Sequence, residues 1–171
     1  MEWTPAIGEV IAGNTSEYEI LAHIDTGGFS EVFKAQEVKT GETVAIKTPN
    51  FDSRSLHLDR FVEREVRGLR TMAVLGGHDS AMSLREHIVI RGTDVLVVEF
   101  VDGDLLTSLE KPLNSDTVRE LGIELAAVLG TFHRNDMVYR DLKADNAFVV
   151  GNALVLVDFN TIRPISRCFE C

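Results

Sequence analysis

The hydrophobic pattern of this chain of 171 residues changes its period at Gly103. Before this glycine, apolar and polar residues alternate in short runs, which is typical of β-strands. After it, apolar residues recur every three or four positions over residues 115–134, which is typical of an amphipathic helix. Because strand patterns predominate before Gly103 and helical patterns predominate after it, the sequence predicts an α+β fold with two lobes.

The first lobe is expected to cover residues 18–101, after an N-terminal arm of residues 1–17. It should contain a five-stranded antiparallel sheet and one inserted helix, with strands over residues 18–25, 31–37, 43–48, 87–90 and 95–101 and the helix over 56–74. The second lobe, residues 102–171, is expected to be an abbreviated helical lobe. Its predicted elements are a short helix over 105–109, a long helix over 115–134 capped by Ser115, and a hairpin of residues 147–150 and 153–157.

The charge balance restricts the possible partners. The chain has 17 Lys and Arg residues against 27 Asp and Glu residues, and this net charge of −10 argues against a broad basic surface for nucleic acid or an anionic membrane. No apolar run reaches the roughly 18–20 residues that span a bilayer, and the N-terminus lacks the pattern of a signal peptide. We therefore expect no membrane span and a cytoplasmic location, or delivery into a host cytosol if the protein is an effector.

Two cysteines, Cys168 and Cys171, form a Cys-x-x-Cys motif near the end of the sequence. Two thiolates are half of a tetrahedral zinc site, and a redox motif of this kind normally opens a helix. A plain tail is therefore the preferred interpretation, and metal and redox roles are the alternatives.

The predicted helix over residues 56–74 carries one carboxylate on its apolar face. Glu65 has Phe61, Val62 and Leu69 at helical spacing, so it should point inward, where a carboxylate without a partner is costly. Lys47 ends an apolar strand 18 residues earlier in the chain. An ion pair between Lys47 and Glu65 is the predicted solution, and an exposed strand lysine is the alternative.

A dense group of polar side chains occurs in residues 139–146 and at Asp158. The predicted hairpin would fold Asp141 and Asn146 back toward Asp158. Carboxylate and amide oxygens are the ligands that Mg²⁺ prefers when it bridges to phosphates, and Asp141 could accept a proton from an attacking hydroxyl. The spacing favours a phosphate-directed site over an ordinary polar turn.

In combination these motifs resemble the protein kinase family over residues 18–160. The resemblance rests on the Val-Ala-Ile-Lys strand that ends at Lys47, on Glu65, on the Arg-Asp-Leu-Lys-x-x-Asn loop that ends at Asn146, and on the Asp-Phe pair that begins at Asp158. It implies a two-lobe kinase fold, ATP as substrate, and Mg²⁺, or Mn²⁺ in its place, as the metal ion.

The resemblance also implies a role for each site residue. Lys47, held by Glu65, would contact the α- and β-phosphates, and Asn146 and Asp158 would hold the metal ion. Asp141 would orient or deprotonate the substrate hydroxyl, and Lys143 would neutralise the γ-phosphate. The remaining ATP contacts would come from the phosphate loop and the adenine site: Gly27, Gly28, Ser30, Val32, Ala45, Val98, Glu99, Val101, Asp104 and Phe148.

The sequence departs from the family pattern at several positions. Asp25 and Ser30 replace two glycines of the phosphate loop, which leaves Gly27 in place and could weaken nucleotide binding. Tyr139 stands where histidine is usual and can still pack against an aromatic ring. Asn160 stands where glycine is usual, and asparagine tolerates left-handed backbone angles, so we expect it to allow the presentation of Asp158.

The sequence ends 13 residues after Asp158, so the resemblance implies a minimal or truncated catalytic core without an activation segment. The apolar face of the helix over 115–134 should then be exposed or covered by a protein partner. A second place for a partner is the arginine-rich helix face of Arg60, Arg64 and Arg67, which could dock an acidic protein. Its alternative is a solvated face with internal ion pairs.

The function that follows is an ATP- and Mg²⁺-dependent protein kinase, a transferase acting on Ser or Thr hydroxyls. Lys143, two residues after Asp141, favours Ser/Thr over Tyr by resemblance. One alternative is a pseudokinase or truncated module that binds a nucleotide or a partner without turnover. The other is a small-molecule kinase of kinase-like fold.

Overall fold

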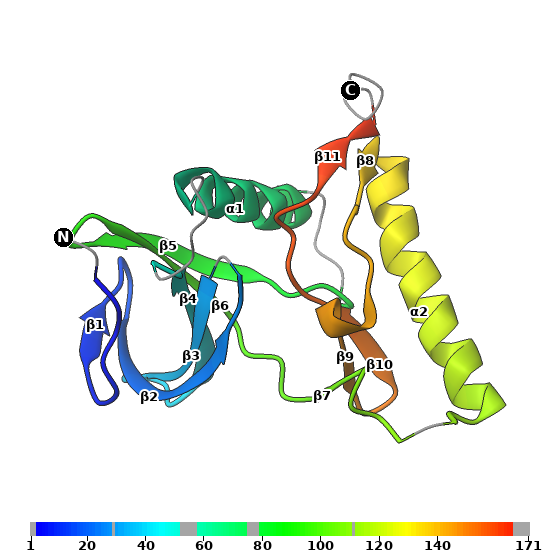
Figure 1. The fold of residues 1–171 in the computed structure, drawn as a ribbon, viewed down its shortest axis with the longest axis horizontal. Helices are drawn as coiled ribbons and strands as arrows, with labels where there is room; N and C mark the ends of the chain where they lie inside the picture. The colour runs from blue at the N-terminus through cyan, green and yellow to red at the C-terminus, as the bar shows by residue number, and fades with distance from the viewer. Residues whose placement is uncertain (1–2, 29, 52–57, 75–78, 111, 166–171) are drawn as a thin grey trace. The chain divides into compact units, whose positions relative to one another are not determined.

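The computed structural model describes residues 3–28, 30–51, 58–74, 79–110 and 112–165 (Figure 1). The chain divides into two compact units. The first comprises Met1–Val66 and Ser83–Phe100, and the second comprises Arg67–Met82 and Val101–Cys171. Each unit has its own sheet and its own buried side chains, so the predicted α+β class is confirmed.

The first unit is built on a curled antiparallel sheet with the strand order β1-β2-β3-β4-β6-β5 (Figure 1). Its strands are β1 (Val10–Ala12), β2 (Glu17–Thr26), β3 (Ser30–Glu37), β4 (Thr43–Pro49), β5 (Leu84–Ile90) and β6 (Thr93–Glu99). The core consists of alternate side chains from these strands, such as Ile20, Val44, Ile46, Val95 and Val97, all fully buried. This period-2 burial explains why the strands could be predicted from alternation.

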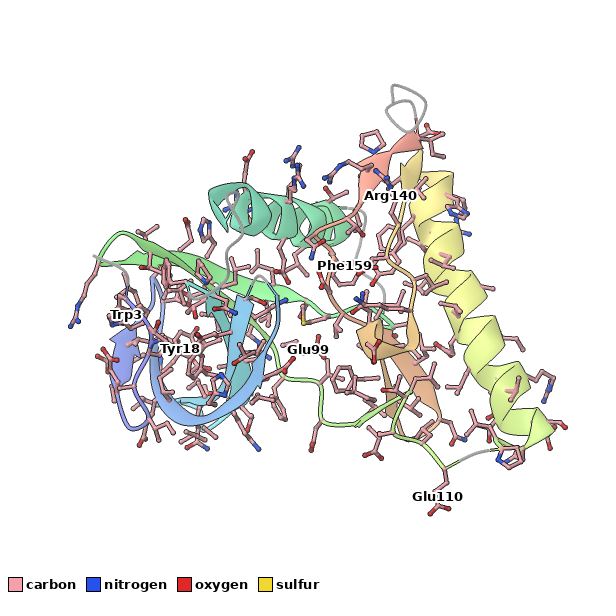
Figure 2. The ribbon with its side chains drawn as sticks, in the orientation of Figure 1. Trp3, Tyr18, Glu99, Glu110, Arg140 and Phe159 are labelled. Atoms are coloured by element: carbon pink, nitrogen blue, oxygen red, sulfur yellow. The ribbon has the colours of Figure 1, made fainter. Side chains whose placement is uncertain are left out.

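The sheet has six strands, not the five predicted, because β1 pairs with residues 17–19 of β2. Three residues are too few to show an alternating pattern, so nothing in the sequence marked this strand. Its burial comes from tertiary packing: Ile11 and Trp3 lie in the same core cluster as Tyr18, and Trp3 is only 6% exposed (Figure 2). The predicted N-terminal arm thus contributes Trp3 and Ile11 to the core of this unit.

The turn between β1 and β2 is fastened to β5 by the carboxylate of Glu86. One oxygen accepts a hydrogen bond from the Asn14 N–H at 2.7 Å, and the other accepts from the hydroxyls of Thr15 and Tyr18, the latter at 2.9 Å. Burial raises the pKa of Glu86, but the hydrogen bonds to its charged form outweigh burial and hold this pKa below its ordinary value.

Helix α1 (Leu58–Val74) agrees with the helix predicted over 56–74 for the residues that the structure describes. Its side chains are described over residues 63–71. Glu65, Val66 and Leu69 are buried, whereas Arg64 and Arg67 are exposed, so the helix has the two-faced burial that its periodicity predicts.

The second unit contains one long helix and short strands. These elements are β7 (Asp104–Leu105), α2 (Ser115–Arg134), β8 (Met137–Val138), the 3₁₀ turn η1 (Ala144–Asn146), β9 (Ala147–Val150), β10 (Ala153–Leu156) and β11 (Arg163–Pro164). One sheet has the order β10-β9-β7, and β8 pairs with β11 (Figure 1). Within this unit Phe132 and Val128 of α2 are fully buried, as are Leu156 and Phe159. The lobe is therefore abbreviated and only partly helical.

Two local predictions in this unit were wrong. Residues 105–109 do not form a helix, because Leu105 pairs with Phe148 in β9 and the chain then turns. Gly103 permits this pairing, since a β-carbon at that position would lie 2.5 Å from the Val149 carbonyl oxygen. The cap of α2 is Asn114, not Ser115; the Asn114 side chain accepts a hydrogen bond from the Thr117 N–H at 2.8 Å.

Helix α2 buries only part of its apolar stripe. Leu121, Val128 and Phe132 are buried. Val118 precedes Leu121 at helical spacing but is 54% exposed, and Ile123 is 59% exposed. Among the described residues, no helix is both long and apolar enough to cross a bilayer.

Candidate phosphate and metal site

In the first unit the predicted ion pair between Lys47 and Glu65 is present. Strand β4 places Lys47 opposite Val32 of β3 and Leu96 of β6, and the Lys47 Nζ donates a hydrogen bond to Glu65 Oε1. The two side chains are 11% and 1% exposed. At such low exposure an ammonium group is held at one place by its carboxylate partner, which suits it to contact an anion.

The glycine turn between β2 and β3 is also held in place within this unit. The Gly27 N–H donates to the Ser30 carbonyl at 2.8 Å. The Gly27 carbonyl accepts a hydrogen bond of 2.8 Å from the side-chain amide of Asn50, a buried residue three positions after Lys47. Nothing in the sequence distinguishes Asn50 as a site residue, because an asparagine at the end of a strand is ordinarily a turn residue.

The second unit presents Asp141 on a loop that folds back on itself. The Asn146 side-chain amide donates to the Asp141 main-chain carbonyl and to its Oδ2, both at 2.9 Å. The ammonium group of Lys143 lies 3.2 Å from the same Oδ2. Asn146 itself is buried, so its amide orients an Asp141 carboxylate that remains partly exposed.

Asp158 follows β10 and is connected to the same loop. The Val157 N–H donates to the Asn146 carbonyl at 2.9 Å, and the Val157 carbonyl accepts from the Tyr139 hydroxyl at 2.8 Å. Asp158 has a φ of 63°, a left-handed conformation that L-residues other than glycine adopt rarely. Such an outlier, enclosed by hydrogen bonds, is typical of a functional position.

The side-chain oxygen atoms of this loop suit a Mg²⁺ ion that is shared with substrate phosphates better than a metal ion that is held by protein side chains alone. Among the residues that the structure describes, no group of three or more His, Cys, Asp or Glu side chains could hold a metal ion. Mg²⁺ is usually bound by one or two carboxylates together with substrate phosphates. Asp158 offers one carboxylate, and Asn146 offers its amide oxygen because its amide nitrogen is already directed to Asp141.

The predicted adenine-site residues fall into both units. In the first unit Ala45 lies directly opposite Val98 on the paired strands β4 and β6, and both are buried. In the second unit Phe148 pairs with Leu105, next to the pairing of Asp104 with Val149. Ala45 and Val98 are thus neighbours in the first unit, and Asp104 and Phe148 lie on the paired strands β7 and β9 of the second unit.

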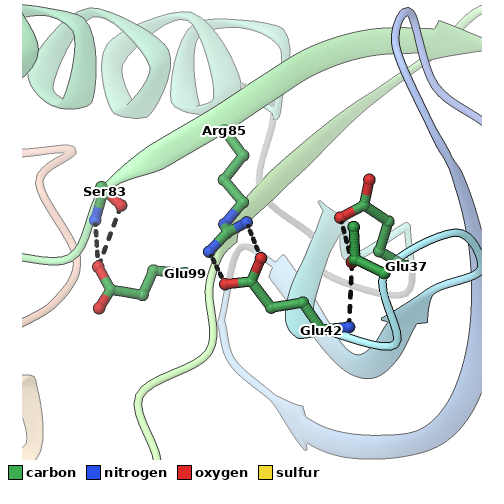
Figure 3. Close-up of polar contacts among 6 residues, drawn as sticks. Glu37, Glu42, Ser83, Arg85 and Glu99 are labelled. Atoms are coloured by element: carbon green, nitrogen blue, oxygen red, sulfur yellow. Dashed lines mark hydrogen bonds and ion pairs between the residues drawn. The ribbon is translucent and has the colours of Figure 1, made fainter.

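Glu99 is bonded to Ser83 through both its main chain and its side chain, and Figure 3 shows the side-chain contacts. The Glu99 N–H donates to the Ser83 carbonyl at 2.9 Å, and its carboxylate accepts from the Ser83 N–H and hydroxyl at 3.2 and 3.0 Å. The N–H of Glu99 is therefore used within the unit. Nearby, Arg85 forms a bidentate ion pair with Glu42 (Figure 3).

The model of the protein kinase domain matches residues 18–168. The chain belongs to the protein kinase family. It is 33% identical over 165 residues to cyclin-dependent kinase 4 of Rattus norvegicus, a match that covers 89% of this chain and 54% of the relative. Cyclin-dependent kinase-like 5 of Homo sapiens is 30% identical over 167 residues, with 95% of this chain and 17% of the relative covered. A probable serine/threonine-protein kinase of Dictyostelium discoideum is 29% identical over 153 residues, with 87% and 29% covered.

The kinase chain spans from about a sixth to about half of the length of these relatives.

The two departures from the family pattern after β8 and β10 are accommodated within the second unit. Tyr139 packs with its ring centroid 6.0 Å from Phe132 and 5.9 Å from Phe159. The prediction that an aromatic residue would pack there is confirmed.

The second departure of this kinase chain, Asn160, contacts Asp158 directly through its side chain. Asparagine was expected to suit this position because it tolerates left-handed angles, but Asn160 has no positive φ, and within this segment the residue with a positive φ is Asp158. Asn160 instead uses its side chain: its Nδ2 donates a hydrogen bond to Asp158 Oδ1. The expectation from the sequence concerned only the backbone of this asparagine, and it did not include this side-chain contact.

The arginine-rich face of the kinase helix α1 is described in part. Arg64, Arg67 and Arg70 are exposed, and Glu63 lies among them. The side chain of Arg60, together with Cys168 and Cys171, lies outside the described residues. The face thus keeps several exposed guanidinium groups on a chain whose net charge is −10.

Proposed function

We propose that this chain is the catalytic part of an ATP- and Mg²⁺-dependent protein kinase that transfers the γ-phosphoryl group to Ser or Thr hydroxyls. The observation that carries the proposal is the arrangement around Asp141. Its Oδ2 accepts from the Asn146 amide and lies 3.2 Å from Lys143, and no hydrogen bond from the described residues reaches Oδ1. Oδ1 is thus available to accept the proton of a substrate hydroxyl, with the carboxylate fixed by its other oxygen.

The phosphates are assigned to cationic side chains and to the metal donors. The Lys47 ammonium, fixed by Glu65, would contact the α- and β-phosphates. Lys143, which is half exposed and borders Asp141, would approach the γ-phosphate as it transfers. Asp158 and Asn146 would hold Mg²⁺, which neutralises phosphate charge when it is bound. Such a site works by positioning and electrostatic stabilisation, so each member should matter by orders of magnitude.

The proposed choice of Ser and Thr rests on two observations. Lys143 stands two positions after Asp141, and the resemblance to the protein kinase family associates a lysine at this position with members that act on Ser or Thr. The relatives with the names reported above include a probable serine/threonine-protein kinase. A peptide array that presents Ser, Thr and Tyr in matched contexts tests this choice, and exclusive labelling of Tyr would contradict it.

The experiment that tests the catalytic proposal compares Asp141→Asn with Asp145→Asn. Both replace an aspartate of the same loop by its isosteric amide, but Asp145 is exposed and contacts none of the site residues in any described hydrogen bond. Transfer of labelled phosphate from Mg²⁺-ATP should fall about 10²–10⁴-fold in Asp141→Asn and stay unchanged in Asp145→Asn. Lys47→Ala should likewise lose transfer.

Equal transfer by wild type and Asp141→Asn would contradict the proposal. Binding of Mg²⁺-ATP by the wild type without transfer to any protein would favour the pseudokinase alternative. Transfer to small alcohols alone would favour a small-molecule kinase.

A protein partner for the arginine-rich face of α1 is part of the proposal. The exposed Arg64, Arg67 and Arg70 on a strongly acidic chain would suit an acidic partner surface. The name of one relative, cyclin-dependent kinase 4, states that this relative depends on a protein partner, a cyclin. A labelled poly-glutamate peptide should bind the wild type in a salt-sensitive way and lose binding in the double variant Arg64→Glu/Arg67→Glu. Undiminished binding would contradict this assignment.

A further inference from the structure

The segment that carries Asp158 is held from both sides by contacts within the second unit. Before it, the main chain of Val157 bonds to Asn146 and Tyr139. After it, Phe159 is fully buried, and the Ile162 N–H donates to the Phe159 carbonyl at 3.3 Å. The backbone of Asp158 is therefore fixed, but these contacts leave its carboxylate free to rotate.

The contact that fixes the carboxylate is the side-chain amide of Asn160. Its Nδ2 donates to Asp158 Oδ1, whereas the Asn160 backbone N–H lies 3.5 Å from the same oxygen, at the outer limit of a hydrogen bond. No hydrogen bond from the described residues reaches Asp158 Oδ2. One oxygen is thus used for orientation, and the other is left available.

Asn160 is itself supported by Arg163, three residues later in the chain. Arg163 donates to the Ile162 carbonyl at 2.7 Å and to the Asn160 carbonyl at 3.4 Å. Because Asn160 does not adopt a positive φ, the position does not need the conformational freedom of glycine. What the structure uses at this position is the amide group, which glycine lacks.

We propose that Asn160 is a positioning residue that holds the Asp158 carboxylate in one orientation and directs Oδ2 to the metal ion. This inference rests on the proposed function, which assigns the metal ion to Asp158. Residues that orient a metal ligand by hydrogen bonding typically change metal affinity by about 10–100-fold when they are removed. The geometry assigns that role to Asn160.

The test measures metal affinity instead of turnover. Mn²⁺ is titrated into the full chain saturated with a non-hydrolysable ATP analogue, and free Mn²⁺ is followed by electron paramagnetic resonance. The variants are Asn160→Ala, Asn160→Gly, Asp158→Asn and the control Asn152→Ala, which alters an exposed asparagine at the turn between β9 and β10. Thermal melts of all variants, without metal, show whether each one folds.

We expect Asn160→Ala and Asn160→Gly to raise the Kd for Mn²⁺ by about tenfold or more, Asp158→Asn to abolish binding, and Asn152→Ala to match the wild type. If Asp158→Asn loses binding while both Asn160 variants keep the wild-type Kd, the positioning role is overturned and the proposed function stands. If Asn160→Gly keeps the wild-type Kd for Mn²⁺ while Asn160→Ala does not, the position requires backbone freedom and not an amide group, and the positioning role is again overturned. If Asp158→Asn binds Mn²⁺ as the wild type does, the metal assignment fails, and this inference fails with it.

Discussion

Replacement of Gly68 by alanine should disturb the segment that carries Asp158, although Gly68 lies in α1, far from it in sequence. A β-carbon at position 68 would lie 2.4 Å from the Phe159 carbonyl oxygen and 2.9 Å from the Phe159 β-carbon. Both are closer than real β-carbon contacts, and the oxygen belongs to the backbone. Phe159 is fully buried between Phe132 and Tyr139, so it cannot move away without disturbing that packing.

The magnitude follows from two opposing effects. Alanine is favoured over glycine in a helix interior by about 1 kcal/mol. Overpacking of a filled core costs about 1–3 kcal/mol. Gly68→Ala should therefore leave the free energy of unfolding unchanged or lower it by up to about 2 kcal/mol. Gly122 of α2 is the matched control, because nothing lies within 4 Å of a β-carbon there, and Gly122→Ala should raise stability by about 0.5–1 kcal/mol.

Urea denaturation followed by circular dichroism gives the free energy of unfolding of both variants. The two should differ by about 1–3 kcal/mol, with Gly68→Ala the less stable. Because the clash falls on the residue after Asp158, Gly68→Ala should also weaken Mn²⁺ binding, whereas Gly122→Ala should not. An equal gain in stability from the two substitutions, or an unchanged Kd in Gly68→Ala, would refute the reasoning.

Three further substitutions test contacts that support the two units. Asn50→Ala removes the hydrogen bond to the Gly27 carbonyl, and the loss of about 1 kcal/mol should raise the KM for ATP about fivefold with little change in kcat. Steady-state kinetics measures both constants. An unchanged KM would argue that this hydrogen bond does not position the glycine turn for ATP. Glu86→Gln should lower the free energy of unfolding at neutral pH by about 1–3 kcal/mol. Since the pKa of Glu86 is lowered in the folded state, its stabilisation is present above its ordinary value of 4.5 and is lost as the pH falls through the folded-state pKa. Urea titrations on both sides of that range should show the difference between wild type and variant shrinking on acidification, and a constant difference would speak against this linkage. Asn114→Ala removes the acceptor for the Thr117 N–H and should cost about 1 kcal/mol, measured in the same way, whereas Ser115→Ala should cost less.

The elements that could be predicted from the sequence are those whose burial follows a regular period. Strands β2 to β4 and helices α1 and α2 each bury a repeated face, so alternation or helical spacing located them within one to two residues. Strand β1 and the turn after β7 lack such repeats. β1 exists because Trp3 and Ile11 fill space in a core formed by distant strands, and Leu105 is extended because it pairs with Phe148. Both depend on partners that no local window contains.

The same distinction applies to the site. Lys47 and Glu65 could be paired in advance because a carboxylate on an apolar helix face requires a partner, and the sheet offered one. Asp141, Asn146 and Asp158 were recognisable as a set because their chemistry is carried by residue type and spacing. Asn50 and Asn160 were not, since an asparagine after a strand is common and its function here is defined by which carbonyl or carboxylate it reaches.

Tyr139 shows how far residue type alone can be taken. Its exchange for the usual histidine was judged tolerable because an aromatic ring could pack on Phe159, and that packing is present. The ring does more than fill space, since its hydroxyl donates to the Val157 carbonyl at 2.8 Å, next to the residue that bears the proposed metal-binding carboxylate. A phenylalanine would keep the packing and lose the donor, and the partly buried carbonyl of Val157 would then lack that bond. Tyr139 and Asn160, the two positions that depart from the family pattern, thus form hydrogen bonds to the adjacent residues Val157 and Asp158. Their side chains hold the short segment in which Asp158 adopts its left-handed φ.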